Sequence, residues 1–210
     1  KKLQDMGMPS VANVSFGHLS DAKRKDLLIS DMRTSSLMIL SPWREGKQRR
    51  MRRLSGGLAY PVHAVLTDAN GDGWDDILIA SHGGMHPSND TKGAATIMLQ
   101  MKNRRFLTIE AASGLGRVTD VRAADLDGDG DKDLAVAAFG WRGPGKLVVL
   151  ENKGPKGNPK PTYTSHELDD RDGFIHAEFA DVDGDGKLDI VAVLSQEHEQ
   201  VVAFLNNGGL

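Results

Sequence analysis

The nonapeptide DLDGDGDKD occupies Asp125–Asp133 and is followed directly by the apolar run LAVAA. It has aspartate at positions 1, 3, 5 and 9 and glycine at positions 4 and 6. The same pattern occurs twice more without gaps, as DANGDGWDD at Asp68–Asp76 and as DVDGDGKLD at Asp181–Asp189. The first residues of the three copies lie 57 and 56 positions apart. Self-similarity at such a period indicates a repeat architecture.

A degraded fourth copy, HLSDAKRKD at His18–Asp26, begins 50 residues before the first complete one. It keeps the final aspartate and the apolar run after it, but it has lost the carboxylates at positions 1, 3 and 5. Lys23, Arg24 and Lys25 would repel a cation. We therefore expect this copy to hold no ion.

The segments around the loops repeat as well. Apolar residues alternate before each loop, as at Val121 and Ala123, and an apolar strand such as Leu134–Ala137 follows it. A third strand such as Leu147–Leu150 comes next, and the first three units close with a more polar segment, at Arg49–Leu54, Phe106–Glu110 and Tyr163–Leu168. Four short strands per repeat, with no 3.6-residue periodicity, predict an all-β fold built of four-stranded antiparallel β-propeller blades.

The repeats predict one β-propeller domain or propeller fragment over residues 1–210. We expect about four blades, at roughly 11–58, 59–116, 117–172 and 173–210, with residues 1–10 as an outer strand. The fourth unit ends after its third strand, so two arrangements are open. Either the segment Leu3–Met8 supplies the missing strand and closes a four-bladed ring, or the chain is part of a larger propeller.

The nonapeptide pattern is typical of a calcium loop. It offers side-chain oxygens at positions 1, 3, 5 and 9 and a backbone carbonyl at position 7, and calcium prefers six to eight oxygen ligands. The two glycines permit the positive φ angles that a tight loop needs. The predicted ligands for about three structural Ca²⁺ ions are Asp68, Asn70, Asp72, Trp74 and Asp76; Asp125, Asp127, Asp129, Asp131 and Asp133; and Asp181, Asp183, Asp185, Lys187 and Asp189.

Two other interpretations of the loops are an EF-hand and a simple turn. An EF-hand would need glutamate at position 12, which is occupied by Ile79, Val136 and Ala192. Simple Asp/Gly-rich turns would not explain three copies in register. Removing the eleven aspartates at positions 1, 3, 5 and 9 would change the formal net charge from −3 to +8. We therefore expect folding to be coupled to metal binding.

The segments Phe179–Val193 and Val121–Gly130 resemble FG-GAP/VCBS repeats. These are the blades of integrin α-subunit propellers and of many bacterial extracytoplasmic proteins. The resemblance covers nearly the whole chain and implies a propeller, often seven-bladed, with calcium in the three loops. The degraded first loop and the shortage of blades depart from the family pattern, and the family as a whole implies no single activity.

The bulk composition narrows the function classes. The chain has no cysteine, which excludes disulfides and thiolate chemistry, and its net charge of −3 does not favour nucleic acid as a partner. No apolar run is long enough to span a membrane, so we expect no direct membrane insertion, and Lys1–Asp5 shows no signal-peptide core. Calcium loops of modest affinity, on the order of 10⁻⁴–10⁻³ M, fill outside the cytosol. The expected location is therefore extracytoplasmic, which includes periplasmic, secreted or cell-surface.

A second polar surface is expected at the opposite ends of the strands. Five residues before each loop lies a polar residue, and the loops between second and third strands share that side of the blades. The resulting ligand face is His63, Asp120, His176, His82, His86, Trp141, Arg142 and His198, with Asn13 in the same column. Solvated polar blade tops are the plainer interpretation.

We expect a binding or scaffolding module whose partners are protein, carbohydrate or neighbouring subunits or domains. The alternative is an enzyme, resembling a polysaccharide lyase or a hydratase, with His63 or His176 as base. The sequence assigns no catalytic residue.

Overall fold

The computed structural model describes residues 11–20, 23–41, 51–154, 160–196 and 199–208. Within them are fifteen β-strands and no helix, arranged as four separate antiparallel sheets. This confirms the all-β prediction. The predicted outer strand at Leu3–Met8 and the residue His198 lie outside the described residues.

Each sheet is one blade, numbered here in chain order. Blade 1 consists of β1 (Val11–Gly17), β2 (Asp26–Asp31), β3 (Ser36–Leu40) and β4 (Met51–Gly56). Blade 2 consists of β5 (Pro61–Thr67), β6 (Asp76–Ser81), β7 (Gly93–Gln100) and β8 (Phe106–Leu115). Blade 3 consists of β9 (Val118–Ala124), β10 (Asp133–Ala138), β11 (Lys146–Asn152) and β12 (Tyr163–Asp169). Blade 4 consists of β13 (Phe174–Ala180), β14 (Asp189–Leu194) and β15 (Gln200–Phe204).

Strands that are adjacent in sequence are also adjacent in every sheet, so each blade is a simple meander. The second strands β6 and β10 are buried along their whole length because a blade packs on each of their faces. The outer strands β8 and β12 are largely exposed, and polar residues dominate β12. The polar fourth segment predicted at Arg49–Leu54 corresponds to β4, which is described from Met51 onward, and β8 runs five residues beyond the predicted Glu110.

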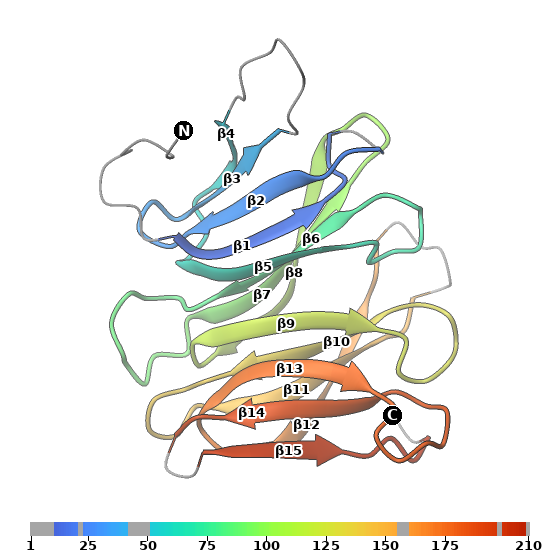
Figure 1. Ribbon diagram of the computed structural model, residues 1–210. Coiled ribbons are helices and arrows are strands. Elements are labelled where there is room, and N and C mark those ends of the chain that lie inside the picture. The colour runs from blue at the N-terminus through green and yellow to red at the C-terminus, as the bar shows by residue number, and fades with distance from the viewer. Residues whose placement is uncertain (1–10, 21–22, 42–50, 155–159, 197–198, 209–210) are drawn as a thin grey trace.

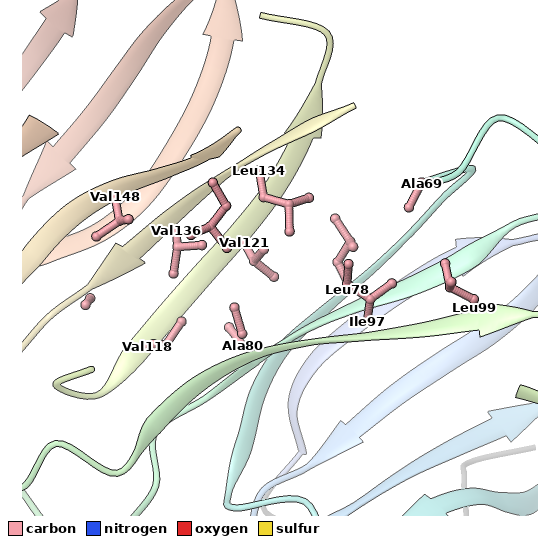
Figure 2. Packing of buried hydrophobic residues seen from close by; sticks show 13 residues of the cluster. Ala69, Leu78, Ala80, Ile97, Leu99, Val118, Val121, Leu134, Val136 and Val148 are labelled. Carbon is pink, nitrogen blue, oxygen red and sulfur yellow. The ribbon is translucent and has the colours of Figure 1, made fainter. Parts of the chain in front are cut away.

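The blades stack face to face in chain order, with blades 1 and 4 at opposite ends of the described structure (Figure 1). Three apolar clusters fill the spaces between successive blades. Figure 2 shows the one between blades 2 and 3, where Leu78 and Ile97 face Val121 and Val136. Equivalent clusters join blades 1 and 2 around Ile39 and Ile77, and blades 3 and 4 around Val149 and Phe174. The core is therefore a series of repeated interfaces between blades.

The first strand of every blade contains an irregularity at the same place. The pairing with the second strand shifts by one residue between Val11 and Asn13, Pro61 and His63, Val118 and Asp120, and Phe174 and His176. Such β-bulges change the direction in which the following side chain points. The residue that follows the bulge is in each blade the member of the predicted polar column.

Candidate functional site

The acidic nonapeptides form the corners between the first and second strands of blades 2, 3 and 4. Position 4 has φ angles of 73°, 79° and 81° at Gly71, Gly128 and Gly184, as the sequence predicted. Position 6 has 86°, 91° and 88° at Gly73, Gly130 and Gly186. A Cβ at position 4 would meet no atom within 4 Å. Glycine is needed there because of the left-handed backbone and not because of crowding.

Carboxylates at positions 1, 3 and 5 hold the loops in shape by accepting hydrogen bonds from backbone N–H groups. In blade 4, Asp181 Oδ1 accepts from Gly184 N at 2.7 Å and Asp185 Oδ1 accepts from Lys187 N at 2.8 Å. In blade 3, Asp129 Oδ1 accepts in the same way from Asp131 N at 2.9 Å. These hydrogen bonds form local turns that hold the acidic side chains in place within the loop.

Carboxylate oxygens converge in two of the loops. Asp125, Asp127 and Asp133 each offer an oxygen within 4.8 Å of the others, and so do Asp181, Asp183 and Asp189. In blade 2 the third position is Asn70, whose side-chain oxygen accepts a hydrogen bond from Asp72 N at 3.2 Å. The donors at these corners are hard oxygens, which suit calcium.

Asp131, at position 7 of the blade 3 loop, lies among other negatively charged carboxylates. Its Oδ1 atom is buried and has no hydrogen-bond partner among the described residues. Burial, together with the charges of Asp129 and Asp133, raises the pKa of Asp131 to about 6. A cation held by Asp125, Asp127 and Asp133 would reduce the repulsion among these carboxylates, so the residues present fit a divalent ion. Sequence reasoning gave Asp131 only a backbone role.

The position-9 aspartates also accept backbone hydrogen bonds, a role that the sequence did not predict. Asp133 Oδ2 accepts from Leu126 N at 2.9 Å, and its Oδ1 accepts from Asn152 N at 2.8 Å. The first bond fixes the start of the loop and the second fixes the end of the third strand. Both bonds recur at Asp76, with Ala69 and Gln100, and at Asp189, with Val182 and Asn206.

The degraded loop of blade 1 retains the bond at the start of the loop. Asp26 is fully buried and accepts hydrogen bonds from Leu19 N at 3.0 Å and from Ser20 N at 2.7 Å. The Ser20 hydroxyl adds a third bond at 2.6 Å. The final aspartate is thus used in a loop where the other ligand positions are gone.

A column of polar residues connects the inner strands at the other ends of the blades, as the spacing predicted. His63 Nδ1 lies 2.6 Å from Asp120 Oδ1, and His176 Nδ1 lies 2.7 Å from Asp120 Oδ2. One buried carboxylate of blade 3 therefore contacts imidazoles of both neighbouring blades.

Asp120 is 1% exposed and also accepts hydrogen bonds from Val121 N and Ala177 N. Burial alone would raise the pKa of Asp120, but His63 and the Arg122 charge hold it below its usual value. In blade 1 the column residue Asn13 accepts from Ala64 N at 3.3 Å, which is the same inter-blade bond that Asp120 makes to Ala177.

Arg122 and Glu178 belong to this cluster, although sequence reasoning did not include them. Arg122 Nε lies 3.2 Å from Asp120 Oδ2, and its Nη2 lies 3.2 Å from Glu178 Oε1. Glu178 Oε1 is also 3.4 Å from His176 Nε2. Each lies two residues after a column member, so the period of 2 in a strand could have found them.

The remaining residues of the predicted ligand face form two further groups. Arg117 Nη2 lies 3.0 Å from His82 Nδ1, and Arg117 Nη1 donates to the carbonyl of His86 at 2.7 Å. Burial and, to a lesser extent, the Arg117 charge lower the pKa of His82 to about 4. In the second group the Arg142 guanidinium lies 5.9 Å from the Trp141 ring centroid, and Arg142 N donates to Asn89 at 3.1 Å.

A stack of antiparallel blades with an acidic loop at the same corner of successive sheets defines a repeat protein of the β-propeller class. A comparison with known protein families agrees with this fold class. Residues 68–136 match the family described as FG-GAP-like repeat. The matched part runs from the first loop aspartate of blade 2 into β10. No curated protein matches the chain. Among the described residues, no helix is long and apolar enough to cross a membrane.

Proposed function

We propose that the chain is a calcium-stabilised, extracytoplasmic β-propeller module that binds a protein or carbohydrate ligand or joins neighbouring subunits or domains. The observation that supports it most directly is the convergence of acidic oxygens at the same corner of successive blades. Calcium is structural in this proposal, with one ion in each of the three complete loops.

The balance of charge supports calcium. Asp131 Oδ1 is buried without a partner, and burial, together with the charges of Asp72 and Asp68, raises the pKa of Asp76 to about 7. Groups that resist ionisation in the metal-free loop are the ones a cation stabilises in their charged form. Calcium at ten times its dissociation constant would stabilise the fold by about 1.4 kcal/mol per site. Three weak sites therefore matter only where calcium is plentiful, which supports a location outside the cytosol.

The ligand-binding surface in this proposal is the face around the His63–Asp120–His176 column. The column sits on the inner strands β5, β9 and β13, which lie side by side along one edge of the stack (Figure 1). It combines the partly buried donors of Arg122 and His176 and the exposed carboxylate of Glu178 with a buried centre at Asp120. The half-exposed ring of Trp141, 37% exposed, lies in a loop on the same side and suits contact with a sugar or an apolar side chain.

The calcium part is tested by thermal unfolding with calcium and with a chelator. We expect a higher melting temperature in calcium, together with heat of binding in calorimetry. Asp127→Asn and Asp183→Asn keep an oxygen for the loop turns but remove one ligand charge each, so each should reduce the calcium-dependent gain. Asp170→Asn, an exposed aspartate between β12 and β13 and outside the loops, is the matched control. An unchanged melting temperature in chelator would refute calcium stabilisation.

A second candidate, an enzyme, is favoured by one observation. Asp120 contacts Nδ1 of both His63 and His176, and a carboxylate at Nδ1 sets the tautomer and orientation of an imidazole that acts as base. A lyase acting on acidic polysaccharide would release an unsaturated product with ultraviolet absorbance. The double change His63→Gln and His176→Gln should abolish that activity with the fold intact. A purified, folded protein without such activity on a panel of polysaccharides argues against an enzyme of this class.

A further inference from the structure

A cavity of about 310 Å³ lies between blades 1 and 2, at the ends of the strands that carry the loops. The degraded loop and β4 form one side of it, and β7, β8 and the turn between them form the other. Its volume is at the lower end of the range of small-molecule sites. Two arginines line it, and no acidic residue does so within the described part of the chain. The lining residues are Leu19, Ser20, Arg52, Gln100, Arg104 and Phe106.

Gln100 brings a buried donor without an acceptor to this cavity. The residue is 1% exposed, and its Nε2 atom has no hydrogen-bond partner among the described residues. Buried polar groups almost always have a partner in folded proteins. An acceptor oxygen on a ligand in the cavity would provide one.

Arg104 is held beside the cavity by contacts with both neighbouring corners. Its Nη1 donates to the carbonyl of Leu19 at 2.8 Å, and its guanidinium lies 4.6 Å from the Trp74 ring centroid. Its backbone has a φ angle of 64°, a left-handed conformation that is unfavourable for a residue with a side chain. Only one of the five N–H groups of the guanidinium is used by Leu19, so others can donate to a ligand. A side chain that is already fixed loses little conformational freedom on binding.

The charge around the cavity favours an anion. Arg52 is exposed and makes no ion pair within the residues that the structure describes. The carboxylates that contact the lining residues Ser20 and Gln100 are those of Asp26 and Asp76. Both are buried and accept hydrogen bonds from backbone N–H groups. They therefore do not neutralise the arginines.

The blade 1 corner thus differs in sign from the complete loops. Position 3 is Ser20 here, whereas blades 3 and 4 have Asp127 and Asp183. The turn after β7 brings the guanidinium of Arg104 to the same corner. A corner that holds carboxylates in blades 3 and 4 therefore holds a cationic group between blades 1 and 2.

We propose that this cavity binds the oxyanion group, a carboxylate or a sulfate, of a small acidic ligand. The guanidinium groups of Arg52 and Arg104 supply positive charge and paired donors, and Gln100 Nε2 supplies a buried donor. Leu19 and Phe106 offer apolar surface to the rest of the ligand. The site uses neither the carboxylates of the three complete loops nor the polar column. Its failure would therefore leave the proposed function standing.

Titration calorimetry of the whole chain, in calcium at fixed ionic strength, tests the site with two anions in separate experiments. The probes are sodium D-glucuronate for the carboxylate and sodium sulfate for the sulfate, with neutral D-glucose as the control ligand. We expect one binding site for an anion and none for glucose, and the tighter of the two anions identifies the group. Absence of binding by both anions would overturn the proposal, and so would glucose binding as tightly as glucuronate.

Three variants separate this cavity from general attraction to a positive surface. Arg52→Gln and Arg104→Gln should each weaken anion binding by roughly tenfold or more, because each removes a charged donor. Arg52 has no ion pair to lose within the described residues, so its variant should keep the wild-type circular dichroism and melting temperature. Arg105→Gln removes the same charge from the same turn outside the cavity lining, and it should bind like the wild type. Equal weakening by Arg52→Gln and Arg105→Gln would refute a defined site.

Discussion

Asp26 Oδ2 accepts the backbone N–H of Ser20 at 2.7 Å in the one loop that has lost its other acidic positions. The same kind of bond holds the start of each complete loop, where Asp133 Oδ2 accepts from Leu126 N. The position-9 aspartate therefore holds the start of the loop without a metal. Its contribution to stability can be separated from that of the ligand aspartates.

Asp26→Asn should destabilise the protein by about 1–3 kcal/mol, because an amide cannot accept all the hydrogen bonds that the buried carboxylate accepts. The loss should be equal in calcium and in chelator. Asp127→Asn should instead cost stability in calcium and little in chelator. Urea unfolding of both variants in the two conditions checks this. A calcium-dependent loss for Asp26→Asn would show that the first loop binds an ion after all.

Calcium affinity should fall as the pH is lowered. The pKa of Asp76 is raised to about 7 and that of Asp131 to about 6, mainly by burial and then by neighbouring carboxylates. Below these values calcium must displace a proton to bind. Titration calorimetry above pH 7 and below pH 6 should show the weaker binding at the lower pH. Asp131→Asn should reduce this pH dependence.

The metal-free protein should show the opposite trend in stability. Asp76 and Asp131 have folded-state pKa values above those of the unfolded chain. Their contribution is therefore fully present below the ordinary pKa of 3.8 and is lost as the pH rises from there to about 6 for Asp131 and about 7 for Asp76. In chelator, melting temperatures of the wild type should decline over this window relative to the double variant Asp76→Asn, Asp131→Asn. Parallel curves for the two proteins would contradict the assigned shifts.

His82 should make the fold less stable in acid. Burial and the Arg117 charge lower the pKa of His82 to about 4 in the folded state, while the unfolded chain keeps the ordinary histidine pKa of 6.5. The unfolded state therefore binds the proton first, and stability falls as the pH drops from 6.5 towards 4, by up to about 3 kcal/mol. His82→Gln should flatten this loss, measured by urea unfolding against pH. His86→Gln, an exposed neighbour, should leave it unchanged.

Asp120→Asn should destabilise the stack by about 1–3 kcal/mol. The change removes the buried carboxylate that His63, His176 and Arg122 all contact. Chemical unfolding should show the loss when the variant is compared with Asp170→Asn. An unchanged free energy of unfolding would mean that Asp120 does not stabilise the stack. That result would strengthen the proposed role of the column in ligand binding.

The loops and the strand order could be predicted from the sequence because both depend on local signals. Glycine at positions 4 and 6 indicates a loop with a left-handed backbone at these positions. Apolar residues such as Ile77–Ala80 indicate a strand buried on both faces. The polar column was also found from spacing alone, since residues at equal positions of repeated strands occupy equal places in the stack.

The contacts across blades could not be predicted in the same way. The ion pairs of Asp120 depend on how far one blade is rotated against the next and on the bulge before each column residue. The pairing of Arg117 with His82 joins a blade connection to a loop of the previous blade. Val14 and Phe16 alternate like Val121 and Ala123, but their exposure depends on which surfaces have a neighbour.

The buried aspartate at the end of each loop has an evolutionary consequence. Since this residue accepts hydrogen bonds from backbone N–H groups and from no other carboxylate, a mutation that removes an outer carboxylate leaves these bonds in place. Ion sites can therefore be lost from one blade at a time, and each intermediate sequence still folds. The lysine- and arginine-containing corner of blade 1 is what such gradual erosion would leave behind.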